Sequence, residues 1–340
     1  MKEQGESGWS SPAGGTQHRL QDRAGRHGAG LDRTMDLEIG QFSDAGRKRR
    51  NNEDWLGTFQ PEDAGRLAHK GSLFLLADGM GGHEGGELAS RQAVDCVIRA
   101  YMEDGGSDVA ASLQRAVEAA NAALYGAARK PRQGRNSGTT LVAGVIRRGE
   151  LWVANVGDSR AYLLRRGLLE QISQDHSWAA AGEKAGLSEE WVGRHVLTRA
   201  LGTKPHVEVD LFGPLPLEAG DRLILCSDGL TTPLSDAEIQ EIADRYPPQR
   251  ASEALIQAAN ERGGPDNVSA LVVKVKGPGQ GRAGGAGQEA SEGILDRVDR
   301  ALGLVPGRLR LTPALIAAAL LAALILVGLG FALGLLVLGH

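Results

Sequence analysis

The chain has 340 residues, of which 24% are charged and 41% are hydrophobic. Both fractions are typical of globular proteins and exclude a chain that is disordered throughout. Its 38 Lys and Arg residues nearly balance its 42 Asp and Glu residues, which argues against a nucleic-acid-binding protein with a clustered basic excess. The two cysteines, Cys96 and Cys226, lie far apart in apolar runs. A disulfide framework or a cysteine zinc site is therefore excluded, and a reducing compartment is favoured.

Residues 1–34 are rich in Gly, Ser, Gln and Arg and have almost no apolar periodicity. This composition predicts a disordered N-terminal extension. No apolar stretch of a secretory signal is present, so export is not predicted. Because Met35 opens the patterned part of the chain, a misassigned start is the alternative interpretation.

Residues 35–276 carry the pattern of one globular domain, in which short apolar runs predict strands and helical periodicity occurs in separate blocks. Two tight turns, Arg147-Arg148-Gly149 and Arg165-Arg166-Gly167, predict hairpins and hence antiparallel pairing. Ser235 and Glu238 form the capping box of a helix start. The predicted fold class is α+β with layered sheets and helices. The predicted strands are 73–77, 139–146, 151–156, 160–164, 222–226 and 268–275, and the predicted helices are 84–102, 108–128, 236–245 and 251–262.

The C-terminal part changes composition twice. Residues 277–311 are predicted to be a Gly-rich linker and a short juxtamembrane helix. Residues 314–338 contain no charged side chain, and as a helix they would extend roughly 37 Å, enough to cross a hydrocarbon core of about 30 Å. A buried helix of a soluble core is the alternative. Because Arg300, Arg308 and Arg310 precede this run, residues 312–340 are predicted to be a single-pass transmembrane tail anchor in the cell membrane, with the N-terminal bulk in the cytoplasm.

Four aspartates share one sequence context, in which an apolar run ends and a turn with glycine or asparagine follows. A single Asp beside Gly is ordinary turn chemistry. Four such carboxylates gathered at one end of a sheet would repel one another unless cations neutralise them, and hard oxygen ligands favour Mg²⁺ or Mn²⁺. The four residues are Asp78, Asp158, Asp228 and Asp266.

A further acidic pair, Glu53-Asp54, follows a basic run that contains Arg49. A solvated turn is one interpretation. The functional interpretation is a guanidinium presented to a phosphate beside a metal cluster, because the planar fork of Arg matches phosphate oxygens bidentately.

Nine short motifs follow one another through this domain, each weak alone but specific in combination. They are Ser43-Asp44-Ala45-Gly46, Arg49-x-x-Asn52-Glu53-Asp54, Ala77-Asp78-Gly79-Met80-Gly81-Gly82-His83, Ser137-Gly138-Thr139-Thr140, Val156-Gly157-Asp158-Ser159-Arg160-Ala161-Tyr162, Asp175-His176-Ser177, Leu197-Thr198-Arg199-Ala200-Leu201-Gly202, Cys226-Ser227-Asp228-Gly229-Leu230 and Gly263-Gly264-Pro265-Asp266-Asn267. With these motifs, residues 37–276 resemble the bacterial metal-dependent (PPM, type 2C) serine/threonine protein phosphatases.

The resemblance implies a four-layer αββα sandwich, two antiparallel sheets flanked by helices, in agreement with the hairpins. It also implies two Mn²⁺ or Mg²⁺ ions, with a third in bacterial relatives. The roles that it implies are a bridge between two metals for Asp78, a backbone-carbonyl ligand for Gly79, ligands of the other metal for Asp228 and Asp266, metal-bound waters for Glu53 and Asp54, support of the third metal for Asp158, and phosphate binding for Arg49.

The implied mechanism is direct attack of a water whose pKa two cations lower. It needs no protein nucleophile, and Cys96 and Cys226 are interpreted as core residues. Met80 stands where many eukaryotic relatives carry a histidine thought to protonate the leaving oxygen, so the source of that proton stays open. His83 and His176 are interpreted as turn or packing residues.

Residues 177–196 lie between two motifs, where the family has a mobile flap beside the metal site. They are interpreted as the substrate-facing flap, with Trp178 and Trp191 as its aromatic residues. A surface helix hairpin would have a similar sequence.

The leading hypothesis is a membrane-tethered protein phosphatase that acts on phosphoserine and phosphothreonine in proteins and opposes a Ser/Thr protein kinase. One alternative is a catalytically dead relative that serves as a binding or regulatory module, which would predict substitutions at Asp78, Asp228 or Asp266. The other is a phosphoesterase on the same scaffold that acts on a small phosphorylated molecule.

Overall fold

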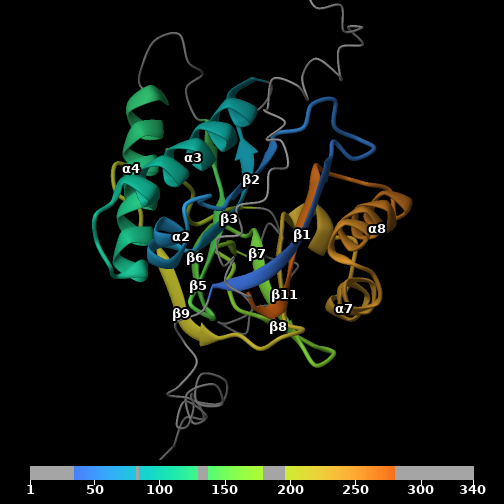
Figure 1. Cartoon of the computed structure of the whole chain (residues 1–340). Coiled ribbons are helices and arrows are strands. Elements are labelled where there is room, and N and C mark those ends of the chain that lie inside the picture. Colours follow the sequence, from blue (N-terminus) through green and yellow to red (C-terminus); the bar gives the residue numbers. More distant parts are fainter. Residues whose placement is uncertain (1–33, 82–83, 129–136, 179–195, 280–340) are drawn as a thin grey trace, which may run out of the picture. The chain divides into compact units, whose positions relative to one another are not determined.

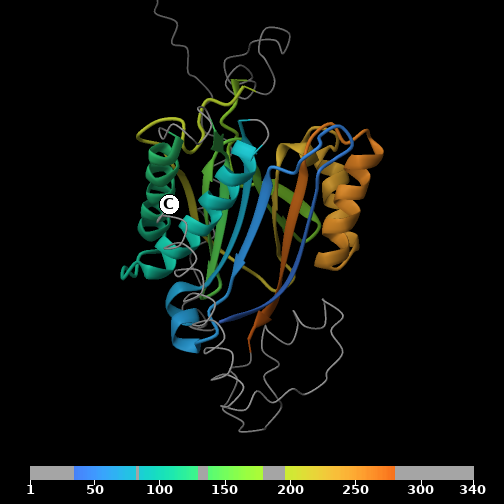
Figure 2. The ribbon, with the colours of Figure 1, turned by 90° about the horizontal axis from the view of Figure 1, so that it is seen from above.

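In the computed structural model, which describes residues 34–81, 84–128, 137–178 and 196–279, two antiparallel sheets pack face to face. Helices cover the outer face of each sheet (Figure 1), and the view from above in Figure 2 shows the resulting order of helices, sheet, sheet and helices. The two-sheet α+β part of the predicted fold class agrees with this arrangement.

The first sheet has the strand order β1-β11-β10-β7-β8, and every neighbouring pair in it is antiparallel. Its outer face packs against α7 and α8, with the short α6 at the end of β10. The elements are β1 (Met35–Asp44), β7 (Arg160–Arg165), β8 (Leu168–Gln171), β10 (Arg222–Cys226), β11 (Val268–Pro278), α6 (Asp228–Thr231), α7 (Asp236–Arg245) and α8 (Pro248–Glu261).

The second sheet has the order β2-β3-β5-β6-β9, and the short β4 pairs with the end of β3. The helices α3 and α4 cover its outer face, and α2 lies between β2 and β3 in the chain. The elements are β2 (Asp54–Phe59), α2 (Ala64–Lys70), β3 (Ser72–Met80), α3 (Glu84–Glu103), α4 (Val109–Ala128), β4 (Gly138–Thr139), β5 (Leu141–Arg147), β6 (Glu150–Val156) and β9 (Asp210–Pro216).

The central strands are buried on both faces. Along β3, Phe74 and Leu76 pack into the core between the two sheets, whereas Leu73 and Leu75 pack under α3 and α4. Successive side chains of a strand point to opposite faces. A strand covered on both sides therefore has a continuous apolar sequence, which is why β3 and β10 were predictable.

Both predicted hairpin turns are confirmed. Arg148 and Gly149 connect β5 to β6, and Arg166 and Gly167 connect β7 to β8. All four residues have a positive φ, between 52° and 78°, as a two-residue hairpin loop that follows the twist of the strands requires. The predicted capping box at Ser235 is also present at the start of α7.

Four strands were not predicted: β1, β2, β8 and β9. All four are sheet edges, and every position of β9 is partly buried or exposed. Edge strands of this kind carry polar residues and therefore lack the apolar run on which the prediction depended.

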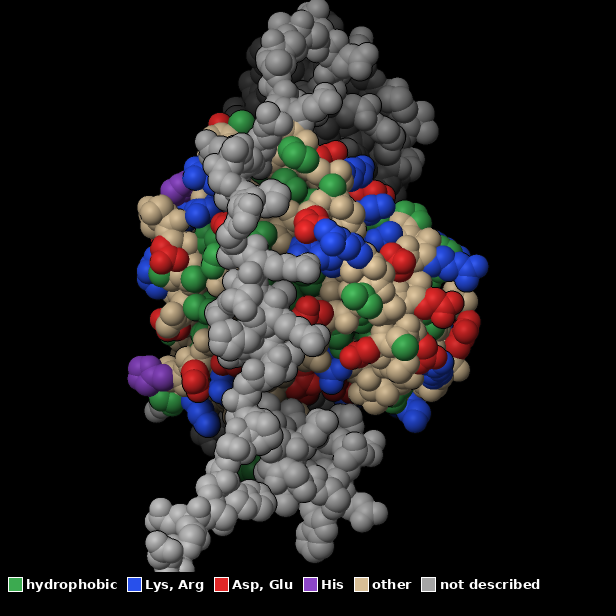
Figure 3. Space-filling model, turned by 90° about the horizontal axis from the view of Figure 1, so that it is seen from below, with side chains coloured by type: hydrophobic (Ala, Val, Ile, Leu, Met, Phe, Trp, Pro, Cys, Tyr) green, Lys and Arg blue, Asp and Glu red, His purple; other side chains and the backbone are tan. Residues whose placement is uncertain are grey.

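The C-terminal transmembrane helix in the predicted fold class is corrected. Among the residues that the structure describes, no helix is both long enough and apolar enough to cross a membrane. The two longest helices there, α3 and α4, each bury one face against the second sheet and expose polar positions on the other. Acidic and basic side chains are likewise interspersed over the face shown in Figure 3. The segment 312–340, to which the tail-anchor prediction referred, lies outside the described residues.

Candidate active site

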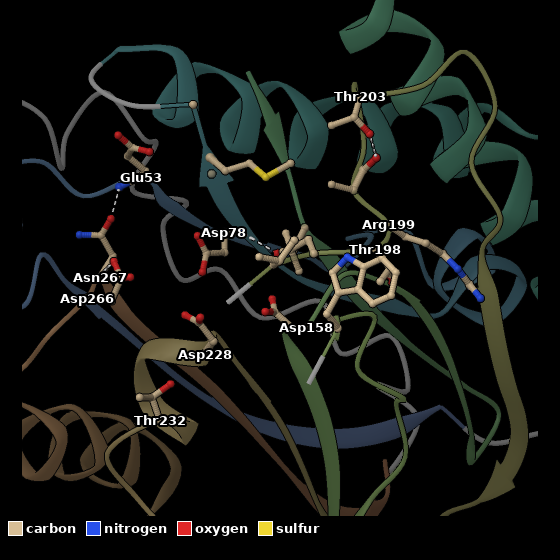
Figure 4. Close-up of a pocket in the computed structure, with 18 of the residues that line it drawn as sticks. Glu53, Asp78, Asp158, Thr198, Arg199, Thr203, Asp228, Thr232, Asp266 and Asn267 are labelled. Atoms are coloured by element: carbon tan, nitrogen blue, oxygen red, sulfur yellow. Dashed lines mark hydrogen bonds between the residues drawn. The ribbon is translucent and has the colours of Figure 1, made fainter. Parts of the chain in front are cut away.

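Five of the predicted acidic residues line one pocket of about 1020 Å³. Glu53, Asp78, Asp158, Asp228 and Asp266 reach it from strand ends and loops of both sheets. Figure 4 shows Asp78, Asp158 and Asp228 converging at its centre, with Glu53 and Asp266 beside them. The structure thus brings together residues as far apart in sequence as Glu53 and Asp266.

Backbone pairing fixes where these carboxylates lie. In the antiparallel pair of β2 and β3, Asp54 stands opposite Asp78. Asp228 is the first residue of α6, directly after β10. Asp158 lies in the turn between β6 and β7, and Asp266 lies in the loop that leads into β11. Asp78 therefore lies near the end of a strand, and the other three predicted aspartates lie in segments that adjoin strand ends.

Burial and mutual repulsion disfavour the ionised forms of these carboxylates. Burial raises the pKa of Asp78 well above its ordinary value, and the charges of Asp54, Asp228, Asp158 and Asp266 raise it further. Burial, followed by repulsion from Asp228, raises the pKa of Asp158 to about 7. A cluster of this kind is electrostatically favourable only when positive charge is bound to it.

Asp54, opposite Asp78 in the pairing of β2 with β3, is 4% exposed and does not line the pocket. Its Oδ2 accepts a 2.8 Å hydrogen bond from the Ser227 hydroxyl, whereas its buried Oδ1 has no hydrogen-bond partner in the described part of the chain. Burial also raises the pKa of Asp54. A buried carboxylate oxygen without a donor beside Asp78 and Asp228 is the kind of group that a metal-bound water satisfies.

The donor set fits hard divalent cations. No group of three or more His, Cys, Asp or Glu side chains in residues 34–81, 84–128, 137–178 and 196–279 is already arranged to hold a metal ion. Mg²⁺-like ions keep several waters and take only one or two protein carboxylates each. A pocket with dispersed carboxylates and the unpartnered oxygen of Asp54 meets that requirement.

Glycine is required at position 79, which also lines the pocket. A Cβ there would lie 2.2 Å from the backbone oxygen of Gly86 and 2.6 Å from that of Glu53. The Gly79 N–H donates a 3.0 Å hydrogen bond to the same Glu53 oxygen. The close packing of three backbone segments therefore sets the position of the residue directly after Asp78.

Arg49 lies at the rim of the pocket. Its Nη2 donates a 2.8 Å hydrogen bond to Oδ2 of Asp266, and its side chain is 56% exposed. The bond to Asp266 raises the pKa of Arg49. The guanidinium carries five N–H donors, so it has the capacity to contact a phosphate from this position.

Two polar residues that were quoted within motifs, but not given a role, hold the site together. Asn267 joins three segments: its Oδ1 accepts from the Glu53 N–H at 2.9 Å, and its Nδ2 donates to the carbonyls of Ala45 and Asn51. Thr140 accepts a 2.9 Å hydrogen bond from the Asp78 N–H. Their place beside the aspartates and within the motifs was the signal in the sequence.

Of the two predicted flap tryptophans, Trp178 lines the pocket and is 55% exposed, whereas Trp191 lies outside the described residues. The two ends of the flap segment are joined, because the Trp178 N–H donates to the Val196 carbonyl at 2.9 Å. Met80 lines the pocket as well. Cys226 is buried within β10, and Cys96 lies on α3, partly buried against the core; neither lines the pocket.

The layered fold with a pocket of buried carboxylates and an arginine at its rim defines a candidate metal-dependent phosphoester site. Residues 51–270 match the family model described as Protein phosphatase 2C. The chain belongs to this family, as the sequence resemblance indicated.

Relatives and solved structures agree with this assignment. The chain is 36% identical over 242 residues to the serine/threonine phosphatase stp of Listeria innocua, a match that covers 68% of this chain and 93% of the relative. It is 36% identical over 248 residues to the serine/threonine protein phosphatase PstP of Mycobacterium tuberculosis, covering 71% of this chain and 46% of that protein. The catalytic domain of PstP, solved in complex with two manganese ions, matches with a TM-score of 0.61 and 34% identity over 71% of this chain and 99% of that one.

Proposed function

We propose that the chain is a metal-dependent protein phosphatase that hydrolyses phosphoserine and phosphothreonine in proteins. The observation that carries the proposal is the convergence of Asp78, Asp158 and Asp228 in one pocket, with Arg49 at its rim. Membership of a family whose relatives are named serine/threonine phosphatases supports the substrate class.

In this proposal Asp78, the carbonyl of Gly79, Asp228 and Asp266 would hold the two metal ions. Glu53 and Asp54 would accept hydrogen bonds from waters of the bound ions, and Asp158 would help to hold a third ion. The two manganese ions of the related PstP domain support Mn²⁺ as one of the cofactors, and Mg²⁺ has the same preference for oxygen ligands.

The bound ions supply positive charge and a water of lowered pKa for direct attack on phosphorus. The protein side chains hold the ions in place and orient the phosphate. Arg49 orients the phosphate through its fork, and the carboxylates fix the charges in place without reorganisation. No protein nucleophile is required, which agrees with the positions of Cys96 and Cys226 outside the pocket lining. Met80 cannot donate a proton to the leaving oxygen.

A phosphatase of this specificity removes the phosphate group that a Ser/Thr protein kinase adds. We therefore infer that the chain opposes such a kinase and takes phosphorylated proteins as its partners. Released phosphate and the free hydroxyl of Ser or Thr are the two products of this reaction.

The test measures phosphate release from phosphothreonine and phosphoserine peptides by the full chain with Mn²⁺, Mg²⁺ or EDTA. Asp228→Asn is expected to lower kcat at least roughly a hundredfold, because removing a charge aimed at the reacting centre costs several kcal/mol. Asp95→Asn, the same change at an exposed position of α3, is the matched control. Activity of Asp228→Asn within about tenfold of wild type contradicts the metal assignment. Release from phosphometabolites but not from phosphopeptides identifies the small-molecule phosphoesterase instead.

A further inference from the structure

His176 is a buried histidine beside the pocket, 4% exposed, and it is bonded at its ring and its backbone. Its Nδ1 accepts a 3.1 Å hydrogen bond from the Gly157 N–H, and its own N–H donates to the Gly157 carbonyl at 2.9 Å. Gly157 immediately precedes Asp158. One histidine therefore holds both backbone groups of the residue before a candidate metal carboxylate.

These contacts fix the tautomer of His176. The Gly157 N–H is only a donor, so Nδ1 must be unprotonated, and the ring proton of the neutral histidine is then on Nε2. Nε2 lies 3.0 Å from Oδ2 of Asp210 and donates to it. The Arg199 guanidinium donates to the other oxygen, Oδ1, at 2.5 Å. The same Arg199 nitrogen, Nη1, lies 3.2 Å from Nε2 of His176, and this is a close contact between two donors.

Asp210 orients the ring in the manner of the outer partner of a metal-ligating histidine, although here the histidine holds backbone rather than metal. Burial raises the pKa of Asp210, but the hydrogen bonds from His176 and Arg199 outweigh burial and lower it below its ordinary value. Asp210 also stands opposite Asn155 in the pairing of β9 with β6. The Asn155 side chain donates to the Gly157 carbonyl at 3.3 Å.

The Gly157 turn, which carries Asp158, also packs against a residue that is bonded to Asp78. Gly157 has φ of +113°, and a Cβ on it would lie 2.6 Å from Cβ of Thr140. The Thr140 hydroxyl accepts from the Asp78 N–H and lies 2.7 Å from the Ser159 hydroxyl. The turn that carries Asp158 is thus packed against the residue that holds the backbone of Asp78.

The backbone of His176 also reaches the base of the flap segment. The Thr198 N–H donates to the His176 carbonyl at 2.8 Å, and Ser177 pairs with Leu197 in an antiparallel bridge. His176 therefore joins the Gly157 turn, through its ring and its backbone, to the two ends of the flap segment.

We propose that His176, oriented by Asp210, is a positioning residue that holds the Gly157–Asp158 turn in register with Asp78 and with the base of the flap. The proposal rests on the proposed function for its kinetic consequences but not for its structural ones. Its effect on the reaction is to keep Asp158 where a divalent ion can use it.

Two substitutions in the full chain test the contacts of the two ring nitrogens one at a time. In His176→Asn the amide oxygen occupies the place of Nδ1 and accepts from Gly157, but the contact with Asp210 is lost. In His176→Gln the amide nitrogen reaches the place of Nε2 and donates to Asp210, but no acceptor remains for Gly157. His69→Gln, at an exposed position at the end of α2, is the matched control.

The structural readout is hydrogen exchange of the 155–160 backbone, measured by mass spectrometry in the presence of EDTA. His176→Gln is expected to accelerate exchange there roughly tenfold or more, with His176→Asn closer to wild type. The kinetic readout is the Mn²⁺ concentration for half-maximal activity, which His176→Gln is expected to raise roughly tenfold, the scale typical of outer-shell partners, with a smaller change in KM for the peptide. Wild-type exchange and wild-type Mn²⁺ dependence in His176→Gln would overturn the proposal.

Equal losses of thermal stability in both His176 variants, with unchanged Mn²⁺ dependence, would also overturn it, since they indicate packing alone. Where neither His176 variant folds, Asp210→Ala serves as the test: it leaves the histidine in place and is expected to accelerate exchange of the same segment, and unchanged exchange refutes the proposal. Failure of the proposed function has a different signature, because the wild-type chain would then release no phosphate while the exchange difference persists.

Discussion

Asp158→Asn is expected to stabilise the metal-free protein, although it removes a candidate metal residue. Burial and repulsion from Asp228 raise the pKa of Asp158 from 3.8 to about 7. At ~1.4 kcal/mol per pKa unit, keeping Asp158 ionised in the folded state costs about 4 kcal/mol. Asn has nearly the same shape and no charge, so the substitution removes this cost.

The pH dependence follows from the sign of the change in pKa. The folded-state pKa lies above the unfolded-state value, so the folded state keeps the proton longer as the pH rises. The cost is absent below about pH 4, grows between about pH 4 and 7, and is complete above that. In EDTA the variant is therefore expected to be more stable than wild type by about 4 kcal/mol at pH 8 and by about 2 kcal/mol at pH 5.

The assay is urea unfolding of the full chain in EDTA at both pH values, followed by tryptophan fluorescence and linear extrapolation. Asp95→Asn, on the exposed face of α3, is expected to change the free energy of unfolding by less than about 0.5 kcal/mol. Added Mn²⁺ is expected to stabilise wild type more than Asp158→Asn, because ligand binding to the folded state stabilises it. An advantage of the variant that does not grow from pH 5 to pH 8 would refute the electrostatic reasoning.

Two further predictions concern the backbone and the rim of the pocket. Gly79→Ala is expected to destabilise the protein by about 1–3 kcal/mol, as overpacking does, because its Cβ would lie 2.2 Å from the Gly86 carbonyl oxygen; urea unfolding measures this, and a stability equal to wild type contradicts the close packing. Arg49→Lys keeps the positive charge but loses the planar fork, so KM for a phosphothreonine peptide is expected to rise about tenfold with a smaller fall in kcat. Steady-state kinetics decide this prediction, and an unchanged KM means that Arg49 does not orient the phosphate.

Local chemistry explains which parts of the fold were predictable. The hairpin turn at Arg148-Gly149 and the capping box at Ser235 each depend on a few consecutive residues, and both are present. The strand β3 has an apolar sequence because both of its faces are covered. By contrast, β9 is a half-exposed edge strand whose pairing with β6 depends on residues some sixty positions away, and nothing in its own composition indicates a strand.

The candidate site likewise has a part that was predictable from sequence and a part that was not. Each aspartate was predictable from an apolar run followed by a turn, and the convergence of Asp78 with Asp228 follows from the stacking of the two sheets. The bonds that hold the aspartates in place were not predictable. His176 contacts Gly157, which is 19 residues away, and Asp210, which is 34 residues away. Neither spacing carries a periodic signal, so His176 was interpreted as a turn or packing residue.

The two kinds of site residue differ in how they affect stability, and this difference is measurable. The buried carboxylates repel one another and so destabilise the metal-free fold. Burial of the three hydrophobic cores offsets this repulsion. Neutralising a carboxylate such as Asp158 should therefore raise metal-free stability and weaken the response to Mn²⁺. His176 has a hydrogen-bond partner at each ring nitrogen, so removing its Nδ1 acceptor should loosen the Gly157 turn and lower stability. A residue that weakens metal dependence while raising metal-free stability acts through its charge, whereas one that weakens metal dependence while loosening the backbone acts through position.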